Sequence, residues 1–159
     1  MAPTKTMTPS IGERLFAEHQ RFDALFSQLL ADMHAGDWSI CQATWNVFER
    51  DLLEHMAAEE ALVLPTFERV NPAETAKLRE EHVAVRHWLA ELGVCLELHA
   101  VKEANVQRLV ESLRSHAARE DALLYRWATK LAPELQKTLL ARLSAHPGVA
   151  PAPKPSVIA

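Results

Sequence analysis

The second of four long helical segments carries two ionisable residues on its apolar face. The positions on that face follow one another at steps of three or four residues: Cys41, Trp45, Phe48, Leu52, His55, Glu59 and Leu62. Because His55 and Glu59 are four residues apart, they project from one face of a helix, one turn apart. Buried ionisable groups are costly unless they are paired or bound to a metal. A fold that buries this face must therefore provide a partner or a metal for both side chains.

The same pair recurs in the fourth helical segment, as His116 and Glu120. Single histidines, His19 and His82, stand on the apolar faces of the first and third segments. The chain thus contains a weak internal repeat, in which each half supplies one histidine and then one His-x-x-x-Glu. The candidate metal ligands are His19, His55, Glu59, His82, His116 and Glu120.

Capping signals indicate where the helices begin and end. Ser10 with Glu13 forms a capping-box pattern, and Asn71 followed by Pro72 is the sharpest helix start in the chain. Pro65 lies inside the second segment and should kink it or remove a backbone hydrogen bond. We expect helices over about residues 10–35, 37–71, 72–98 and 105–127, and a short fifth helix over about 132–144.

Four amphipathic helices with short connections predict an all-α fold, an antiparallel up-down-up-down four-helix bundle. The chain has 159 residues and only 4 glycines, which agrees with a single helical domain that has a sizeable core. We expect a flexible N-terminal arm over 1–9 and a metal-binding domain over 10–145, which includes the short extra C-terminal helix. The Pro-rich composition of 146–159 predicts a disordered tail.

In that topology the four histidines fall in one layer. Depth is measured from the end that holds the first inter-helix loop, at about 1.5 Å of rise per residue. On this scale His19 and His82 lie roughly 25 Å along the bundle. His55 lies roughly 27 Å along it, and His116 roughly 21 Å. Since unrelated histidines would have no reason to coincide in depth, we interpret the layer as a metal centre.

Composition argues against several other classes of protein. A net charge of −4 and a pI of about 6.1 do not indicate a nucleic-acid partner. No apolar run approaches the roughly 20 residues that span a bilayer, and the first residues show no apolar signal segment. We therefore expect no membrane partner and a cytoplasmic location. Cys41 and Cys95 should lie at the same end of the bundle, either as a redox-switchable pair or as two small buried side chains.

The ligand set suits two metal ions. Four imidazoles and two carboxylates exceed the needs of a closed tetrahedral zinc site. They suit two octahedral transition-metal ions bridged by Glu59 and Glu120, with positions left open for a small diatomic molecule or water. The alternative is that each His-x-x-x-Glu is a buried hydrogen-bonded pair without metal. We expect Glu60 and Glu81 to be solvated or to orient ligating histidines. Tyr125 is expected to be a core residue, with a role in shuttling electrons or shielding the metal as the alternative.

These residues resemble the hemerythrin HHE cation-binding family. The likeness covers roughly residues 10–130 and rests on four motifs: His19, His55-x-x-x-Glu59-Glu60 followed by Pro65, Glu80-Glu81-His82, and His116-x-x-x-Glu120. It implies a four-helix bundle with a non-haem di-iron centre, whose two iron ions are oxo- or hydroxo-bridged; manganese and zinc are alternatives. It also implies that the four layer histidines are ligands and that the two glutamates bridge the ions.

The chain departs from the oxygen-carrying hemerythrins at two places. Those proteins have a second histidine four residues from the first in the third helix, where this chain has Leu78 and Arg86. They also place the last carboxylate five residues after its histidine, which is Asp121 here. Five residues turn a helix by about 500°, so Asp121 falls off the His116 face. We prefer Glu120 and keep Asp121 as the lesser candidate. The missing ligand favours redox chemistry over reversible oxygen carriage.

The function we expect is that a di-iron centre binds or reduces a small diatomic molecule or oxidant: O2, peroxide or NO. The sequence does not decide between enzymatic turnover and binding. One alternative is a non-enzymatic iron-binding sensor or an iron-handling or storage protein. A further alternative is a metal-free helical interaction module. Iron content, the visible spectrum and the effect of chelator on melting temperature distinguish these functions.

Overall fold

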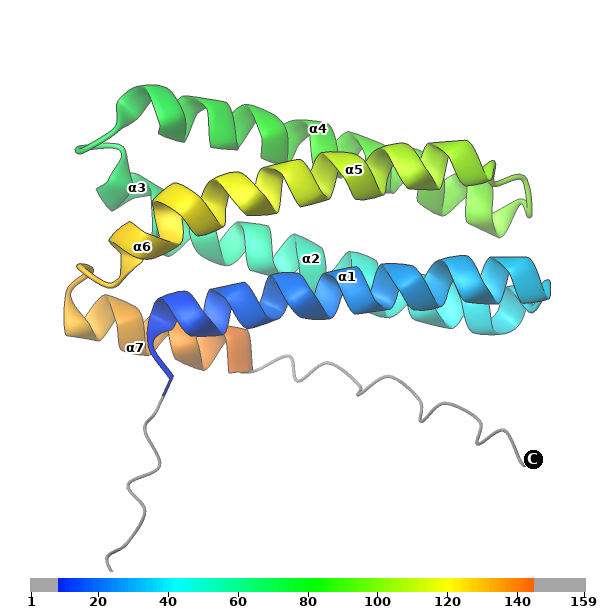
Figure 1. Cartoon of the computed structure of the whole chain (residues 1–159), viewed down its shortest axis with the longest axis horizontal. Helices are drawn as coiled ribbons and strands as arrows, with labels where there is room; N and C mark the ends of the chain where they lie inside the picture. Colours follow the sequence, from blue (N-terminus) through cyan, green and yellow to red (C-terminus); the bar gives the residue numbers. More distant parts are fainter. Residues whose placement is uncertain (1–8, 145–159) are drawn as a thin grey trace, which may run out of the picture.

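The computed structural model describes residues 9–144, and their regular structure is entirely helical (Figure 1). The helices are α1 (Ile11–Ala35), α2 (Trp38–Leu62), α3 (Leu64–Phe67), α4 (Pro72–Glu97), α5 (Glu103–Arg119), η1 (Glu120–Leu124), α6 (Tyr125–Ala128) and α7 (Pro133–Ser144). No strand occurs between residues 9 and 144, so the prediction of an all-α chain is confirmed over this range. The expected arm, apart from Pro9, and the Pro-rich tail over 146–159 lie outside the described residues.

The four long helices α1, α2, α4 and α5 lie side by side along their lengths (Figure 1). Helices α1 and α4 each pack against both α2 and α5, so the four enclose a common interior. The C-terminal α7 packs against α2 and α1, near the end where α1 begins (Figure 1). The arrangement is a helical bundle, in which side chains from four separate segments can meet.

The structure reproduces two of the predicted helix starts together with their capping bonds. The Glu13 amide donates to Ser10 Oγ over 3.2 Å, and the Ser10 amide donates to Glu13 Oε2 over 2.7 Å. Asn71 Oδ1 accepts from the Glu74 amide over 3.2 Å, with Pro72 at the first helical position. Each cap satisfies amides that have no partner within the helix, which fixes where α1 and α4 begin.

Two predicted helices are interrupted. The segment expected as one kinked helix over 37–71 is divided at Val63 into α2 and the single-turn α3. Pro65 explains the division, because it has no amide hydrogen and its ring clashes with the carbonyl four residues earlier. The fourth helix changes to a π-type turn, η1, in which the Tyr125 amide donates to the Glu120 carbonyl five residues earlier. Helical periodicity gave no sign of this turn.

Buried apolar side chains form two separate clusters along the bundle. In α1, Ile11 and Leu15 belong to one cluster, and Phe22, Leu25, Phe26 and Leu29 belong to the other. In α4, Leu78 belongs to the first cluster and Val85 to the second. His19 and His82 lie between these positions in sequence. The predicted histidine layer therefore separates two apolar cores.

Within residues 9–144, no helix combines the length and apolar character needed to cross a membrane. Cys41 is buried and Cys95 is half-buried, and both are free thiols in the described part of the chain. A redox pair between them stays a prediction.

Candidate metal centre

The six predicted ligands converge from the four long helices. His19 comes from α1, His55 and Glu59 from α2, His82 from α4, His116 from α5 and Glu120 from the start of η1. Five of them are buried, and the His19 side chain is only 10% exposed. Their ligand atoms form two groups that share Glu120, and within each group all atoms lie within 4.8 Å of one another.

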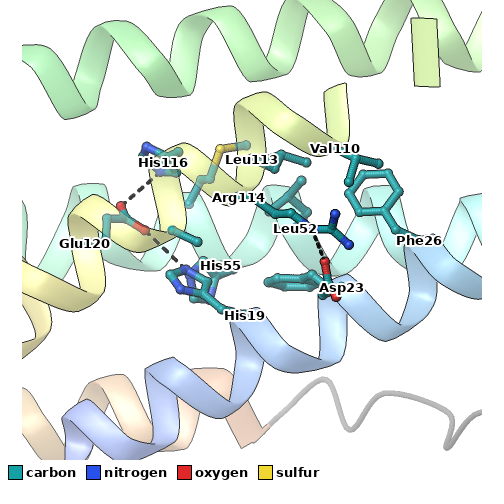
Figure 2. A pocket seen from close by; sticks show the side chains of 13 residues that line it. His19, Asp23, Phe26, Leu52, His55, Val110, Leu113, Arg114, His116 and Glu120 are labelled. Carbon is teal, nitrogen blue, oxygen red and sulfur yellow. Dashed lines mark hydrogen bonds and ion pairs between the residues drawn. The ribbon is translucent and has the colours of Figure 1, made fainter. Parts of the chain in front are cut away.

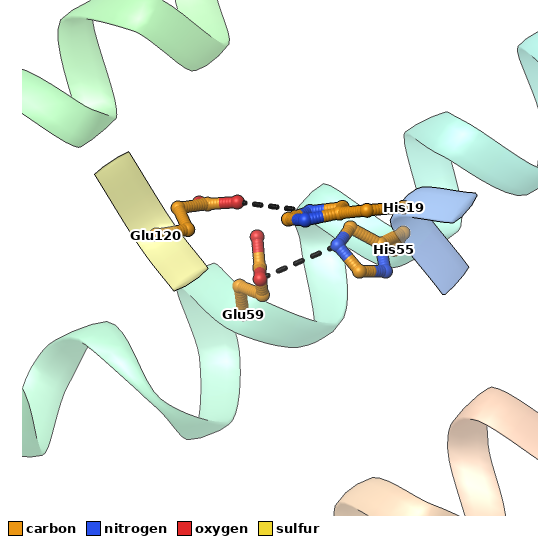
Figure 3. Close-up of side chains that lie close together, drawn as sticks. All are labelled: His19, His55, Glu59 and Glu120. Carbon is orange, nitrogen blue, oxygen red and sulfur yellow. Dashed lines mark ion pairs between the residues drawn. The ribbon is translucent and has the colours of Figure 1, made fainter. Parts of the chain in front are cut away.

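The first group consists of His19, His55, Glu59 and Glu120 (Figure 3). His55 Nε2 lies 3.3 Å from Glu59 Oε1, and His19 Nε2 lies 3.2 Å from Glu120 Oε2. All four side chains point toward one another from three different helical segments (Figure 3). Two imidazoles and two carboxylate oxygens at this spacing are a suitable donor set for one transition-metal ion.

The second group consists of His82, His116 and Glu120. The Nε2 atoms of the two histidines are 3.1 Å apart. Glu120 Oε1 lies 3.1 Å from His116 Nε2 and 3.4 Å from His82 Nε2. Two imidazole nitrogens this close would repel each other if both presented lone pairs, unless a proton or a cation lay between them.

Both carboxylates extend from one group to the other. Glu120 directs Oε2 to His19 and Oε1 to the second histidine pair. Glu59 directs Oε1 to His55, while its Oε2 lies 3.5 Å from His82 Nε2. This second Glu59 oxygen is buried and has no hydrogen-bond partner within residues 9–144. Such an atom is costly in an apolar interior, so the donor set fits a pair of cations that share these two carboxylates.

Two of the histidines are held from behind by a carboxylate that is itself paired with arginine. His82 Nδ1 lies 2.9 Å from Glu60 Oε1, and both Glu60 oxygens accept from Arg86, over 2.8 and 2.9 Å. His116 Nδ1 lies 2.7 Å from Glu81 Oε2. Histidines that bind metals usually donate their other ring N–H in this way, which directs Nε2 toward the ion. The expectation that Glu60 and Glu81 orient histidines agrees with these contacts.

Asp121 holds a third histidine in the same manner. Its Oδ1 lies 3.1 Å from His19 Nδ1, on the side of the ring that faces away from the cluster. The structure thus places Glu120 in both ligand groups and Asp121 behind His19. His55 differs from the other three, because its Nδ1 is buried without a hydrogen-bond partner among residues 9–144.

The electrostatics of the layer favour positive charge. Burial alone would lower the pKa of His19, but hydrogen bonds to Asp121 and Glu120 outweigh it and raise this pKa to about 10. For His116, burial is likewise outweighed by the charge and hydrogen bond of Glu120, and the pKa rises to about 9. Burial would raise the pKa of Glu120, but the charge and hydrogen bonds of the histidines hold it well below its ordinary value. Without metal, protons therefore supply the positive charge that the carboxylates require.

The sequence argument did not predict the position of the Tyr125 hydroxyl. Tyr125 is buried, as expected of a core residue, but its hydroxyl lies inside the first ligand group. The phenol oxygen is 2.6 Å from Glu59 Oε1, 2.9 Å from His19 Nε2 and 3.0 Å from His55 Nε2. In sequence, the only sign of this was that Tyr125 lies five residues after Glu120. In a regular α-helix two residues at that spacing face different directions, and only a π-type turn, which is common at functional sites, brings them to the same side.

A cavity of about 50 Å³ adjoins the cluster between α1, α2 and α5 (Figure 2). His19, His55, His116 and Glu120 form part of its wall, and most of the remaining wall is apolar: Phe22, Phe26, Leu52, Met56, Val110, Leu113 and Ala117. At its edge, Arg114 and Asp23 form an ion pair of 2.6 Å, which Figure 2 shows beside the apolar wall. The two also line a more open surface pocket outside.

Comparison with known families agrees with this geometry. The family described as the hemerythrin HHE cation binding domain matches residues 10–128, which include every residue of both ligand groups. No curated protein and no solved structure gave a significant match. The match covers most of the chain. The chain belongs to the hemerythrin HHE cation-binding domain family.

Proposed function

We propose that the chain holds two iron ions in an antiparallel up-down-up-down four-helix bundle and uses them to bind or reduce O2, NO or peroxide. The observation that carries this proposal is the orientation of Glu59 and Glu120. Each carboxylate directs one oxygen to the pair His19 and His55 and the other toward the second histidine pair. A single ion would use only half of this arrangement.

In this proposal the outer carboxylates hold the ligands ready. Glu60, Glu81 and Asp121 each accept a hydrogen bond from a histidine Nδ1, so that Nε2 presents its lone pair to the cation. Iron, when bound, would supply Lewis acidity and one-electron redox chemistry at its open positions. The two apolar clusters on either side limit the access of bulk water to the layer.

The adjoining cavity supports a small substrate. About 50 Å³ holds a few molecules of the size of water or a diatomic gas and is far too small for a metabolite-sized ligand. Its mostly apolar wall favours an uncharged guest, because an anion there would lose its hydration without gaining partners. Since His19, His55, His116 and Glu120 form part of the cavity wall, a molecule in the cavity would lie next to a metal ion held by these residues.

The test is iron content per chain, measured with the near-ultraviolet and visible spectrum of the same sample. We expect about two equivalents of iron and absorption bands that respond to O2, NO or peroxide. A His55→Ala variant should lose iron and bands, whereas His87→Ala removes an exposed α4 histidine, with a side chain 72% exposed, and should change neither.

No stoichiometric metal, together with a melting temperature that chelator does not change, would show that the histidine layer is structural. If iron binds but its absorption bands do not change on addition of O2, NO or peroxide, the iron-handling alternative is favoured instead.

A further inference from the structure

We propose that the Tyr125 phenol oxygen is a further ligand of the ion held by His19 and His55, so that the two metal positions are chemically unequal. The inference rests on the proposed two-ion centre and goes beyond its histidine and carboxylate ligands. It concerns a side chain that the sequence analysis assigned first to the core and did not count among the metal ligands.

The phenol oxygen lies among the same four atoms that the first ion would need. It is 2.6 Å from Glu59 Oε1, 2.9 Å from His19 Nε2, 3.0 Å from His55 Nε2 and 3.3 Å from Glu120 Oε2. All four residues belong to the first ligand group. A cation bound by that group cannot avoid the phenol oxygen unless the tyrosine ring moves away.

In the metal-free chain, protons satisfy these contacts. The phenol has one hydrogen to donate, and the short contact to Glu59 uses it. The contacts to Nε2 of His19 and of His55 need a ring proton on each of these nitrogens, which the phenol oxygen accepts. A histidine that binds a cation through Nε2 no longer has a proton there, because the same lone pair forms the bond to the metal. In the loaded chain the phenol oxygen therefore loses both donors and lies beside the cation, which takes their place.

Backbone packing holds the ring in position. The π-type turn places Tyr125 directly after η1, with its amide bonded to the Glu120 carbonyl. A Cβ added at Gly12 would lie 3.0 Å from the Tyr125 carbonyl oxygen, so α1 already contacts this backbone closely. The ring is 3% exposed and lies between the layer and an apolar cluster, which leaves little room for it to swing aside.

The second ion would have no such ligand. The chain contains one tyrosine, so no other phenol can approach His82 and His116. Phenolate is an established iron ligand and, as a hard anionic oxygen, favours the oxidised ion. On binding, the O–H bond breaks heterolytically, its electron pair forms the bond to the cation, and the proton passes to solvent. No oxidation state changes.

The test uses the iron(III)-loaded full chain and does not depend on activity. We expect a visible phenolate-to-iron charge-transfer band, and resonance Raman excitation within it should enhance phenol ring modes. Because Tyr125 is the only tyrosine, growth on ring-deuterated tyrosine should shift those modes in the otherwise unaltered protein. Tyr125→Phe should lose the band while keeping iron. Trp127→Phe, which alters an aromatic residue packed on Phe67, should keep both.

The outcomes separate the two proposals. Bound iron without a phenolate band or an isotope shift would overturn the role of Tyr125 and leave the di-iron centre standing. Absence of bound iron would overturn both. If Tyr125→Phe fails to fold, as judged by circular dichroism, the isotope experiment on the unaltered chain still decides.

Discussion

Replacing Glu81 by glutamine tests how far the outer carboxylates support the metal centre. Glu81 belongs to neither ligand group, but its Oε2 lies 2.7 Å from Nδ1 of His116, which belongs to the second group. Glutamine keeps the shape of the side chain and can still accept a hydrogen bond. The substitution therefore removes the negative charge, which also weakens the pair that Glu81 Oε1 forms with Arg119 Nε over 3.2 Å.

The expected magnitude for metal binding follows from the contact with His116. A hydrogen bond to a charged group contributes about 1.5–3 kcal/mol, and a neutral one about 0.5–1.5 kcal/mol. The difference of roughly 1–1.5 kcal/mol corresponds to about a tenfold loss of metal affinity. Loss of an outer-shell partner typically costs about 10–100-fold in metal affinity, which agrees with this value at its lower end.

The assay is competition for metal against a chelator of known affinity. Glu80→Gln is the matched control, because Glu80 is the adjacent residue on α4, carries the same charge and is exposed. We expect about tenfold weaker binding for Glu81→Gln and almost no change for Glu80→Gln. Equal affinities for the two variants would refute the reasoning, since they would show that only the net charge of the surface matters.

Four further predictions concern metal affinity and stability as functions of pH, the packing of Gly12, and the entry of ligands beside Arg114. Protons compete with metal for His19 and His116, so metal affinity should rise with pH by up to about tenfold per unit for each proton displaced, until the pH reaches the raised pKa values of about 10 and about 9. The metal-free protein should lose stability as the pH rises from the ordinary histidine pKa of 6.5 to these raised values, because a pKa raised by folding means that the protonated form is stabilised. Chemical denaturation in chelator at several pH values measures this loss. Gly12→Ala should displace the Tyr125 carbonyl and thereby weaken the phenolate band. Overpacking destabilises this variant by about 1 kcal/mol and the better helix propensity of alanine stabilises it by about 1 kcal/mol, so the melting temperature should hardly change. Arg114→Ala removes an exposed ion pair with Asp23 worth less than about 1 kcal/mol, so the free energy of unfolding should hardly change. Because this pair lies at the edge of the cavity, the association of ligands measured by stopped flow should become faster. Unchanged association rates would show that ligands enter by another route.

Much of the fold was predictable because its signals are local. Capping at Ser10 and Asn71 depends on residues three positions apart, and the apolar faces depend on a repeat of 3.6. The convergence of the histidines could also be predicted. Because every α-helix rises by the same distance per residue, the number of residues from a loop gives the depth of a side chain in the bundle.

What the sequence concealed depends on departures from the regular helix. The π-type turn after Glu120 changes the direction of every later side chain, and it is why Tyr125 enters the cluster. No periodic rule predicts such a turn, because its cost is offset by contacts from other segments, such as the approach of Gly12. The role of Asp121 was hidden for a related reason. It acts on His19, a residue of a distant helix, and not on the histidine of its own segment.

The division of the interior into two apolar clusters gives bound metal a mechanical role. The polar layer crosses all four long helices, so the metal-free chain has two hydrophobic halves that can open with separate free energies. An ion shared by His19 and Glu120 would close a loop of about a hundred residues, much as a disulfide does, and restrict the unfolded chain. With metal bound, the two halves would then unfold as one cooperative unit. The steepness of the unfolding transition would therefore measure how much of the centre is occupied, even for an ion that has no visible absorption.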